Sequence, residues 1–192
     1  EPNLKDGFFE GTQDDFFRLY LETARAIKEV DASLKVGGPS TARAEWIPEF
    51  IAFCRRHDTG PDYIIGHIYN NDSDSQPLSP FDGPQEDRAS KSPHFAAGVI
   101  RGTRKLLDGL GFRGEVHWNE WGRSWHPCAP DRETANEAAF IAKTMAEVSQ
   151  LGDCFAYWCL SDIYNQVGYG GSAFHGNYGL LSLQGLRKPG YH

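Results

Sequence analysis

The chain has 192 residues, which is long enough for one domain with a sizeable hydrophobic core. It carries 19 Lys and Arg against 26 Asp and Glu, and the net charge of −7 argues against nucleic acid and against an anionic membrane as partners, since both reward clustered positive charge. No apolar run reaches the roughly 18 residues of a membrane-spanning helix, so no membrane partner is expected, and the location, cytoplasmic or secreted, stays open.

The first part of the chain alternates helical and strand-like patterns. Residues 12–30 carry apolar side chains at spacings of three and four, which predicts a helix with Thr12 as its N-cap. The apolar run at 34–39 predicts a short strand that ends at Gly-Gly-Pro. Residues 44–57 predict a second helix, with Pro48 tolerated in its first turn.

The middle of the chain continues this alternation around a long polar stretch. Residues 62–69 predict a strand. Residues 70–92 are rich in Asp, Ser and Pro and predict a long loop, with a lid and a solvated insert as equal alternatives. A helix is expected at 94–110 and a strand at 114–121.

The last part contains a predicted helix at 131–151, with Asp131 as candidate cap, and an apolar strand at 153–160. The stretch GLLSLQG at 179–185 predicts one more short strand. Short apolar strands that alternate with longer helices are typical of the α/β class, in which helical crossovers connect the strands of a parallel sheet.

Such a sheet can be an open doubly wound sheet or a (β/α)8 barrel. The open sheet usually brings a glycine-rich phosphate turn, and neither GxGxxG nor a Walker pattern is present. A complete barrel needs about 250 residues, and only four clear strands are predicted here. We therefore expect a partial catalytic domain of the (β/α)8 TIM-barrel type over residues 1–192, the C-terminal half with about strands 5–8 and their helices, starting at the end of strand 4.

Glu120 ends a predicted strand in an aromatic setting. Because side chains alternate along a strand, we expect Trp118 and Glu120 on one face and His117 on the opposite face, toward the helix layer. An isolated buried carboxylate is costly unless it is paired or used. A catalytic role for Glu120 and a salt bridge to Arg123 fit the local sequence about equally well.

Other polar and aromatic residues follow predicted strands. Glu1 begins a Glu-Pro-Asn turn where a strand would have just ended, and two glutamates at strand ends of one barrel are the parts of a glycosidase. His67 and Tyr69 lie two residues apart and therefore share a face, either as a sugar-binding pair or as a hydrogen-bonded pair that lines the barrel. Trp158 also ends a strand, and core packing is the favoured interpretation of its position taken alone.

The chain resembles glycoside hydrolase family 39, the β-xylosidase family, over nearly all of its length. The segments that carry the resemblance are EPNLKD, ARAIKEVDASLKVGGP, WIPEFIAFCRR, DYIIGHIY, HWNEW, FAYWCLSDIY and FHGNYGLLSLQGLRKPGYH. EPNLKD resembles the tail of the family's WNEPN acid/base motif, and HWNEW fits its nucleophile strand. The resemblance implies a retaining glycosidase that removes β-linked xylose from xylo-oligosaccharides or xylosides.

The resemblance also implies roles for individual residues. Glu1 would be the acid/base, and Glu120 would be the nucleophile. The residues implied to contact the sugar are His67, Tyr69, Trp158 and Phe8. Asn165 and Gln166 stand where the family usually carries acidic residues that hold sugar hydroxyls; their amides can still form hydrogen bonds but carry no charge. The same chemistry on an arabinoside or a galactoside is therefore an alternative.

Two further alternatives concern the incomplete barrel. Half a barrel closes its pocket poorly, so the chain could bind carbohydrate through Trp121, Trp125 and Trp158 without cleaving it. Two copies could also close one barrel as a homo-oligomer. The expected partner is a carbohydrate substrate, with no cofactor and no metal, since neither HExxH nor a Cys/His ligand spacing is present.

Overall fold

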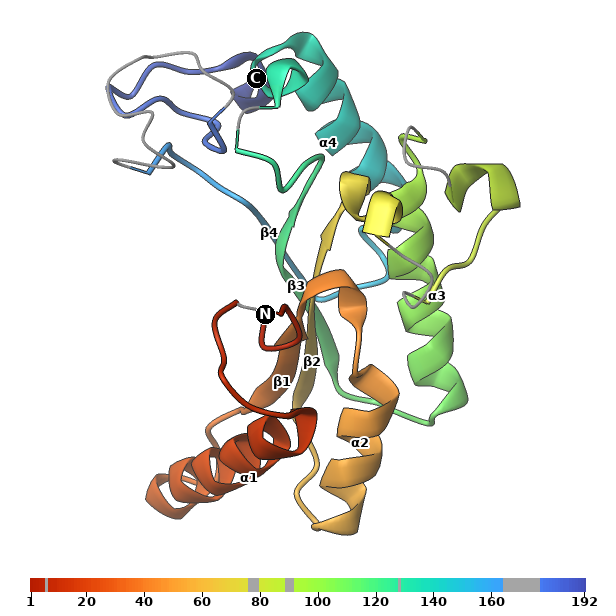
Figure 1. Ribbon diagram of the computed structural model, residues 1–192, viewed down its shortest axis with the longest axis vertical. Helices are drawn as coiled ribbons and strands as arrows, with labels where there is room; N and C mark the ends of the chain where they lie inside the picture. Colours follow the sequence, from red (N-terminus) through yellow and green to blue (C-terminus); the bar gives the residue numbers. More distant parts are fainter. Residues whose placement is uncertain (6, 76–79, 89–91, 128, 164–176) are drawn as a thin grey trace.

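The computed structural model describes residues 1–192 apart from residues 6, 76–79, 89–91, 128 and 164–176. In this described part, four parallel strands form one sheet, in which each strand pairs with its neighbour in sequence. The strands are β1 (Gly37–Thr41), β2 (Tyr63–Tyr69), β3 (Glu115–Gly122) and β4 (Cys154–Tyr157). The helices are α1 (Gln13–Val30), α2 (Ile47–Arg56), α3 (Phe95–Gly109) and α4 (Ala135–Val148). The predicted α/β class with a parallel sheet is confirmed (Figure 1).

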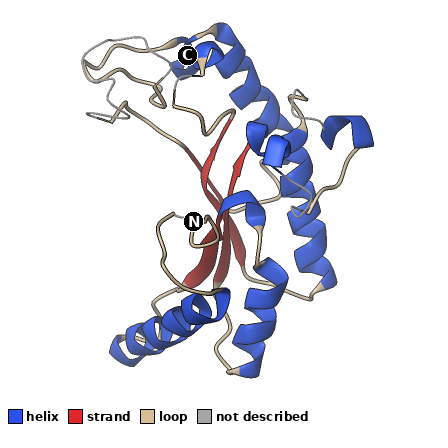
Figure 2. Ribbon diagram, in the orientation of Figure 1, coloured by secondary structure: helices blue, strands red, loops and turns tan. Residues whose placement is uncertain are grey.

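Helices α2 and α3 and the N-terminal segment lie on different sides of the sheet. Figure 2 shows α2 and α3 along one side of the strands and the N-terminal segment across from them. None of the described helices is both long and apolar enough to cross a bilayer.

A local signal in the sequence sets the start of α1 as predicted, whereas α2 begins at Ile47, three residues after the predicted start at residue 44. The Thr12 hydroxyl accepts a hydrogen bond from the Asp15 backbone at 3.2 Å, and the Asp15 carboxylate accepts one from the Thr12 backbone at 2.9 Å. This reciprocal capping box satisfies two backbone donors that the first turn of a helix leaves free. Pro48 lies in the first turn of α2, as predicted.

Two strand predictions are wrong in detail. The Gly-Gly-Pro stretch at 37–39 lies inside β1 instead of ending a strand. Its proline is tolerated because β1 is an edge strand of the described sheet, where one side of the backbone needs no ladder partner. The segment 179–185 forms no regular strand; Leu181 makes isolated bridges to Ser161 and Arg187.

The start of α4 also differs from the prediction. Thr134, not Asp131, is the N-cap, because its backbone is extended and its hydroxyl accepts a hydrogen bond from the Asn136 backbone. Asp131 instead lies in the 3-10 turn that precedes α4, and it pairs with Arg123 at 2.9 Å. Arg123 therefore has a carboxylate partner other than Glu120.

β2 alternates regularly and separates the two faces of the sheet. Ile64 and Ile68 are buried in one hydrophobic cluster with Phe50 of α2 and Val99 of α3. Residues of odd number in β2, which include His67, point to the opposite face. The outer face of β2 thus contributes the core, and its inner face can contribute a site.

A β-bulge in β3 changes which of its residues share a face. Gly66 pairs with Trp118, but the next residue, His67, pairs with Glu120, so Asn119 is an extra residue. A bulge of this kind re-aims the side chains that follow it. Trp118 is only 1% exposed and belongs to the core, whereas Glu120 lies on the inner face. The prediction that these two side chains share a face is therefore wrong.

The prediction for His117 is wrong for the same reason. Its ring stacks on Tyr63 with centroids 4.5 Å apart and an interplanar angle of 14°. Tyr63 shares the inner face of β2 with His67, so His117 points away from the helix layer. It also contacts Glu115 at 3.0 Å, within its own strand.

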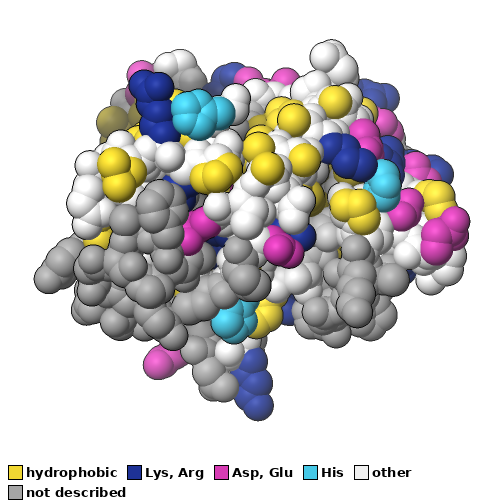
Figure 3. Space-filling view, turned by 90° about the horizontal axis from the view of Figure 1, so that it is seen from above, with side chains coloured by type: hydrophobic (Ala, Val, Ile, Leu, Met, Phe, Trp, Pro, Cys, Tyr) yellow, Lys and Arg dark blue, Asp and Glu magenta, His cyan; other side chains and the backbone are white. Residues whose placement is uncertain are grey.

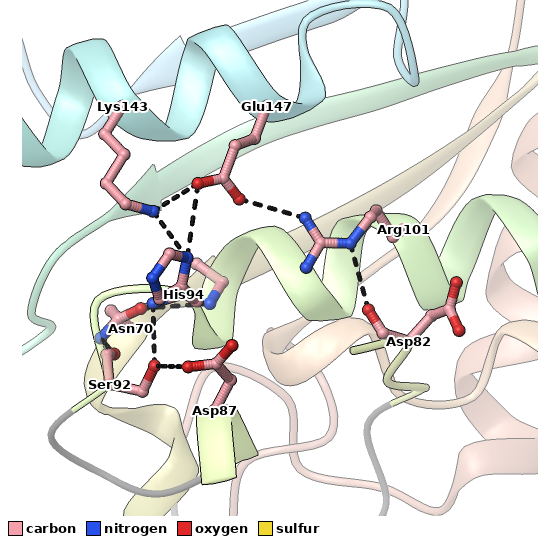
Figure 4. Close-up of polar contacts among 9 residues, drawn as sticks. Asn70, Asp82, Asp87, Ser92, His94, Arg101, Lys143 and Glu147 are labelled. Carbon is pink, nitrogen blue, oxygen red and sulfur yellow. Dashed lines mark hydrogen bonds and ion pairs between the residues drawn. The ribbon is translucent and has the colours of Figure 1, made fainter. Parts of the chain in front are cut away.

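A polar network connects α3, α4 and the segment that precedes α3 (Figure 4). The Lys143 ammonium lies 2.6 Å from His94 Nδ1 and also pairs with Glu147. The Glu147 carboxylate accepts a hydrogen bond from Arg101 at 3.1 Å, and Arg101 donates to the Asp82 carbonyl at 3.1 Å. These contacts hold the two helices and the preceding segment together at the protein surface.

The predicted loop at 70–92 packs against α3 and contains two 3-10 turns, Asn70–Ser75 and Gln85–Arg88. The contact depends on Gly102, because a Cβ at this position would lie 2.6 Å from backbone atoms of residues 80 and 81. Gly109 in the same helix has open space around its Cβ position. The packing of the loop therefore requires glycine at Gly102 but not at Gly109.

We expect Gly102→Ala to lower the free energy of unfolding by about 1–3 kcal/mol, because the new methyl group must displace backbone. The matched control Gly109→Ala should be neutral or raise stability by up to about 1 kcal/mol, through better helix propensity. Urea denaturation of both variants measures the difference. Equal effects at the two positions would contradict the packing described for Gly102.

Candidate active site

A pocket of about 700 Å³ lies at the carboxyl ends of the strands. It is lined by residues that follow or end β1, β2, β3 and β4, together with the N-terminal segment. The sequence-predicted site residues that line it are Glu1, Phe8, His67, Tyr69, Glu120 and Trp158. Two further predicted residues, Asn165 and Gln166, lie outside the described residues.

Glu1 reaches the pocket because its turn is held against the chain that follows β1. The Asn3 amide donates hydrogen bonds to the Ala42 carbonyl and to the Glu45 carboxylate, both at 3.0 Å. The Ala42 backbone N–H donates in return to the Asn3 side-chain oxygen at 2.9 Å. Asn3 therefore uses both its donor and its acceptor to fix the position of Glu1.

His67 joins the two glutamates at the bottom of the pocket. Its Nδ1 lies 3.1 Å from Glu1 Oε1 and 3.5 Å from Glu120 Oε2. The Tyr69 hydroxyl donates a hydrogen bond to Glu120 Oε1 at 2.8 Å. Residues far apart in sequence, from the N-terminal turn, β2 and β3, thus meet around one histidine.

The ligand atoms of Glu1, His67 and Glu120 all lie within 4.8 Å of one another. Among the described residues, this is the cluster that offers carboxylate and imidazole ligands to a cation. The same atoms are already engaged in hydrogen bonds and ion pairs with each other. The expectation that no metal is bound stays a prediction.

The two carboxyl groups have different pKa values. Burial raises the pKa of Glu1, but the hydrogen bond and electrostatic attraction of His67, and then the charge of Arg43, act against burial, and the pKa lies below its usual value. Burial also raises the pKa of Glu120, and His67 and the Tyr69 hydrogen bond lower it only in part, so that it stays raised beside the Glu1 charge. In the free site, Glu120 therefore takes up a proton before Glu1 does.

Aromatic side chains form the rim of the pocket. Trp158 lines it, so the interpretation of this residue as core packing is wrong, and Phe8 lines it while being 82% exposed. Trp125 is half-exposed and also lines it, whereas Trp121 is 2% exposed and packs against Tyr157 and other core rings. Trp121 therefore cannot contact a ligand in this arrangement.

Two charged residues of the pocket were not predicted from the sequence. Arg43 follows β1 with a left-handed backbone (φ 60°), and Asp72 lies in the segment after β2. Burial raises the pKa of Asp72 to about 7, and its carboxylate accepts a hydrogen bond from the Tyr69 backbone at 2.7 Å. No periodic pattern singles out either residue, since both belong to irregular segments.

The described charged side chains that line the pocket include Glu1, Arg43, Asp72 and Glu120. On the face drawn in Figure 3, the described basic and acidic side chains are interspersed with hydrophobic ones instead of being gathered by sign. A small number of charges inside an apolar, aromatic pocket is the usual composition of a site for a small ligand.

Comparisons with known proteins give one family. The family model described as Glycosyl hydrolases family 39 matches residues 1–192. A curated β-xylosidase from Caldicellulosiruptor saccharolyticus is 36% identical over 192 residues, which are 100% of this chain and 38% of that relative. The chain therefore spans well under half of the relative's length.

Solved structures agree with the sequence relatives. The crystal structure of a monomeric β-xylosidase from Caulobacter crescentus CB15 is similar with a TM-score of 0.84 and 34% identity, over 100% of this chain and 38% of that one. The family 39 enzyme from Xanthomonas axonopodis pv. citri is similar with a TM-score of 0.86 and 32% identity, over 100% of this chain and 37% of that one. The four-stranded sheet described above is thus the arrangement found in these enzymes.

We expect Tyr69→Phe to raise the pKa of Glu120 further, because the ionised carboxylate loses a hydrogen bond that favours it. Tyr63→Phe is the matched control, since Tyr63 lies on the same face of β2 but stacks on His117. A ¹³C NMR titration of the glutamate side-chain carboxyls, assigned with Glu120→Gln, measures both. An unchanged or lower pKa in Tyr69→Phe would contradict the role given to this hydrogen bond.

Proposed function

We propose, since the chain belongs to glycosyl hydrolase family 39, that it is part of a retaining glycosidase that removes β-linked xylose from xylo-oligosaccharides or xylosides. In this proposal, Glu1 is the acid/base and Glu120 is the nucleophile. The observation that carries the proposal is the meeting of the two carboxylates in one pocket, with ligand oxygens within 4.8 Å of each other.

The separation of the carboxylates supports retention of configuration. Retaining glycosidases hold their two carboxyl groups about 5–5.5 Å apart, so that one can bond directly to the sugar. Inverting enzymes need about 6.5–9.5 Å, because a water molecule must fit between the sugar and the base. An oxygen of Glu1 and an oxygen of Glu120 lie within 4.8 Å of each other, which is below the separation that an inverting site needs.

The proposed reaction has two steps. In the first, a Glu120 oxygen bonds to the anomeric carbon while Glu1 gives its proton to the leaving oxygen. In the second, ionised Glu1 takes a proton from water, and this water breaks the bond between the sugar and Glu120. Tyr69 holds the Glu120 carboxylate in place through its 2.8 Å hydrogen bond.

The lowered pKa of Glu1 and the raised pKa of Glu120 belong to the site without a sugar. The first step needs the opposite protonation, with a proton on Glu1 and an ionised Glu120. Positive charge that develops at the anomeric carbon during this step favours the ionised form of Glu120. Once Glu1 has given up its proton, its lowered pKa keeps it ionised, which is the form that takes a proton from water in the second step.

The rim residues suit a sugar substrate. Sugars present apolar C–H faces that pack on aromatic rings, and Trp158 and Phe8 line the pocket beside the carboxylates. Asn165 and Gln166 remain predicted ligands of the sugar hydroxyls. Because amides replace carboxylates at these two positions, an arabinoside or a galactoside is the second candidate substrate.

We also propose that the four strands belong to a (β/α)8 barrel, as about strands 5–8 of a catalytic domain. The strand order β1-β2-β3-β4 never reverses, which a barrel requires, whereas an open doubly wound sheet reverses its order at a switch point. The site at the carboxyl ends of the strands fits the same fold.

The roles of the two glutamates can be separated with azide and an aryl β-xyloside whose leaving group departs without a proton. Glu1→Ala should still form the glycosyl-enzyme, and azide should release it as the β-xylosyl azide. Glu120→Ala should react with azide from the opposite face and give the α-xylosyl azide. Both variants should lose at least about 10²-fold in turnover without azide.

Glu115→Gln is the matched control on the same strand, because Glu115 pairs with Lys35 and His117 away from the pocket. It should keep the turnover of the unmodified chain. Azide products of the same configuration from both glutamate variants would contradict the assigned roles.

A panel of aryl glycosides tests the substrate. Turnover of aryl arabinoside or galactoside in preference to xyloside would favour the second substrate, and sugar binding without any turnover would favour a binding-only role.

A further inference from the structure

Ser40 is the extra residue of a β-bulge in β1. Pro39 pairs with Ile65 of β2, and Thr41 pairs with the next residue, Gly66, so that Ser40 has no partner of its own in the ladder. Its backbone is left-handed, with a φ of 58°. Such a conformation costs a serine roughly 1–2 kcal/mol, and proteins keep it mainly where the surrounding structure and function require it.

The strained backbone directs the Ser40 hydroxyl at His67. Ser40 Oγ lies 3.0 Å from His67 Nε2. A bulge is a common device for re-aiming a side chain next to a site. Ser40 itself does not line the pocket, so its contact with the site passes through the histidine.

The two ring nitrogens of His67 face different partners. Nε2 faces Ser40, while Nδ1 faces Glu1 at 3.1 Å and Glu120 at 3.5 Å. A neutral imidazole carries one N–H, and the hydrogen bond made by one nitrogen decides whether the other carries it. With the proton on Nε2, the Nδ1 lone pair would face two carboxylates without a donor between them.

We propose that Ser40 is a positioning residue that donates its hydroxyl proton to His67 Nε2 and thereby keeps the His67 proton on Nδ1, between Glu1 and Glu120. The groups that face His67 are then arranged consistently: a hydroxyl donor on one side and two carboxylate acceptors on the other. Tyr69 supplies the second donor to Glu120, and Arg43 also lines the pocket. The assignment of the proton depends only on this geometry.

The consequence for turnover rests on the proposed function. An N–H at Nδ1 stabilises ionised Glu1, which is the form that acts as a base in the second step. It also restrains the Glu120 carboxylate before it reacts. Loss of the Ser40 hydroxyl should therefore slow turnover without removing any group that touches the sugar.

The direct test is ¹⁵N NMR of the histidine rings at about pH 8.5, where a free imidazole is neutral. In the unmodified chain, His67 should show a protonated Nδ1 and an unprotonated Nε2; its signals are assigned by their loss in His67→Gln. Ser40→Ala should shift the population toward the Nε2–H form. Ser40→Gly removes the same hydroxyl and relieves the left-handed backbone, so it tests the proposal even if the alanine variant folds poorly.

Ser33→Ala is the matched control, because the Ser33 hydroxyl bonds to Asp31 outside the pocket. It should leave the His67 signals unchanged. The proposal is overturned if His67 carries its proton on Nε2 in the unmodified chain. It is equally overturned if neither Ser40 variant changes the position of the proton.

Kinetics separate this proposal from the proposed function. With an aryl β-xyloside, Ser40→Ala and Ser40→Gly should each lower kcat about tenfold with little change in KM, as expected for a misplaced catalytic group. Ser33→Ala should change neither constant. If the catalytic domain that includes this chain turns over no glycoside, the proposed function fails, and the NMR result alone decides the role of Ser40.

Discussion

The contact of one buried histidine with two carboxylates is the interaction on which the rest of the site depends. His67 is the point where β2, β3 and the N-terminal turn come together, since its Nδ1 lies near both Glu1 and Glu120. Two carboxylates at this distance repel each other and lose solvation, so they need donors between and around them. His67 and Tyr69 supply these donors from a single strand.

The sheet can carry this polar cluster because its other face carries the core. In β2, Ile64 and Ile68 are buried among the helices, and the alternating residues are free to face the pocket. In the two neighbouring strands, β1 and β3, the alternation is interrupted at or just before the residue that faces His67. A bulge at Asn119 turns Glu120 toward His67, and a bulge at Ser40 turns a hydroxyl toward the same ring. The site is thus built from one regular strand and two interrupted ones.

Sequence reasoning found what depends on local periodicity. The four helices, the four strands of the sheet and the shared face of His67 and Tyr69 follow from the three-four and two-residue spacings, and Thr12 was found as a cap by its residue type. It failed where pairing across strands decides, as for Trp118 and His117, because a bulge is invisible in the pattern of one strand. The resemblance to a family supplied the roles of Glu1, which is weak evidence by itself, and of Trp158, for which the position alone favoured core packing. Arg43 and Asp72 were missed because irregular segments place them in the pocket.

The central claim is that Glu120 can bond to a sugar within a formed site. It is tested most directly by intact mass after incubation with a 2-deoxy-2-fluoro-β-xyloside that carries a good leaving group, since the fluorine slows both formation and release of the glycosyl-enzyme and the good leaving group restores its formation. The account predicts a stoichiometric increase by one fluoroxylosyl group, mapped by peptide analysis to Glu120. No increase in a folded chain, or attachment to any other residue, would contradict it.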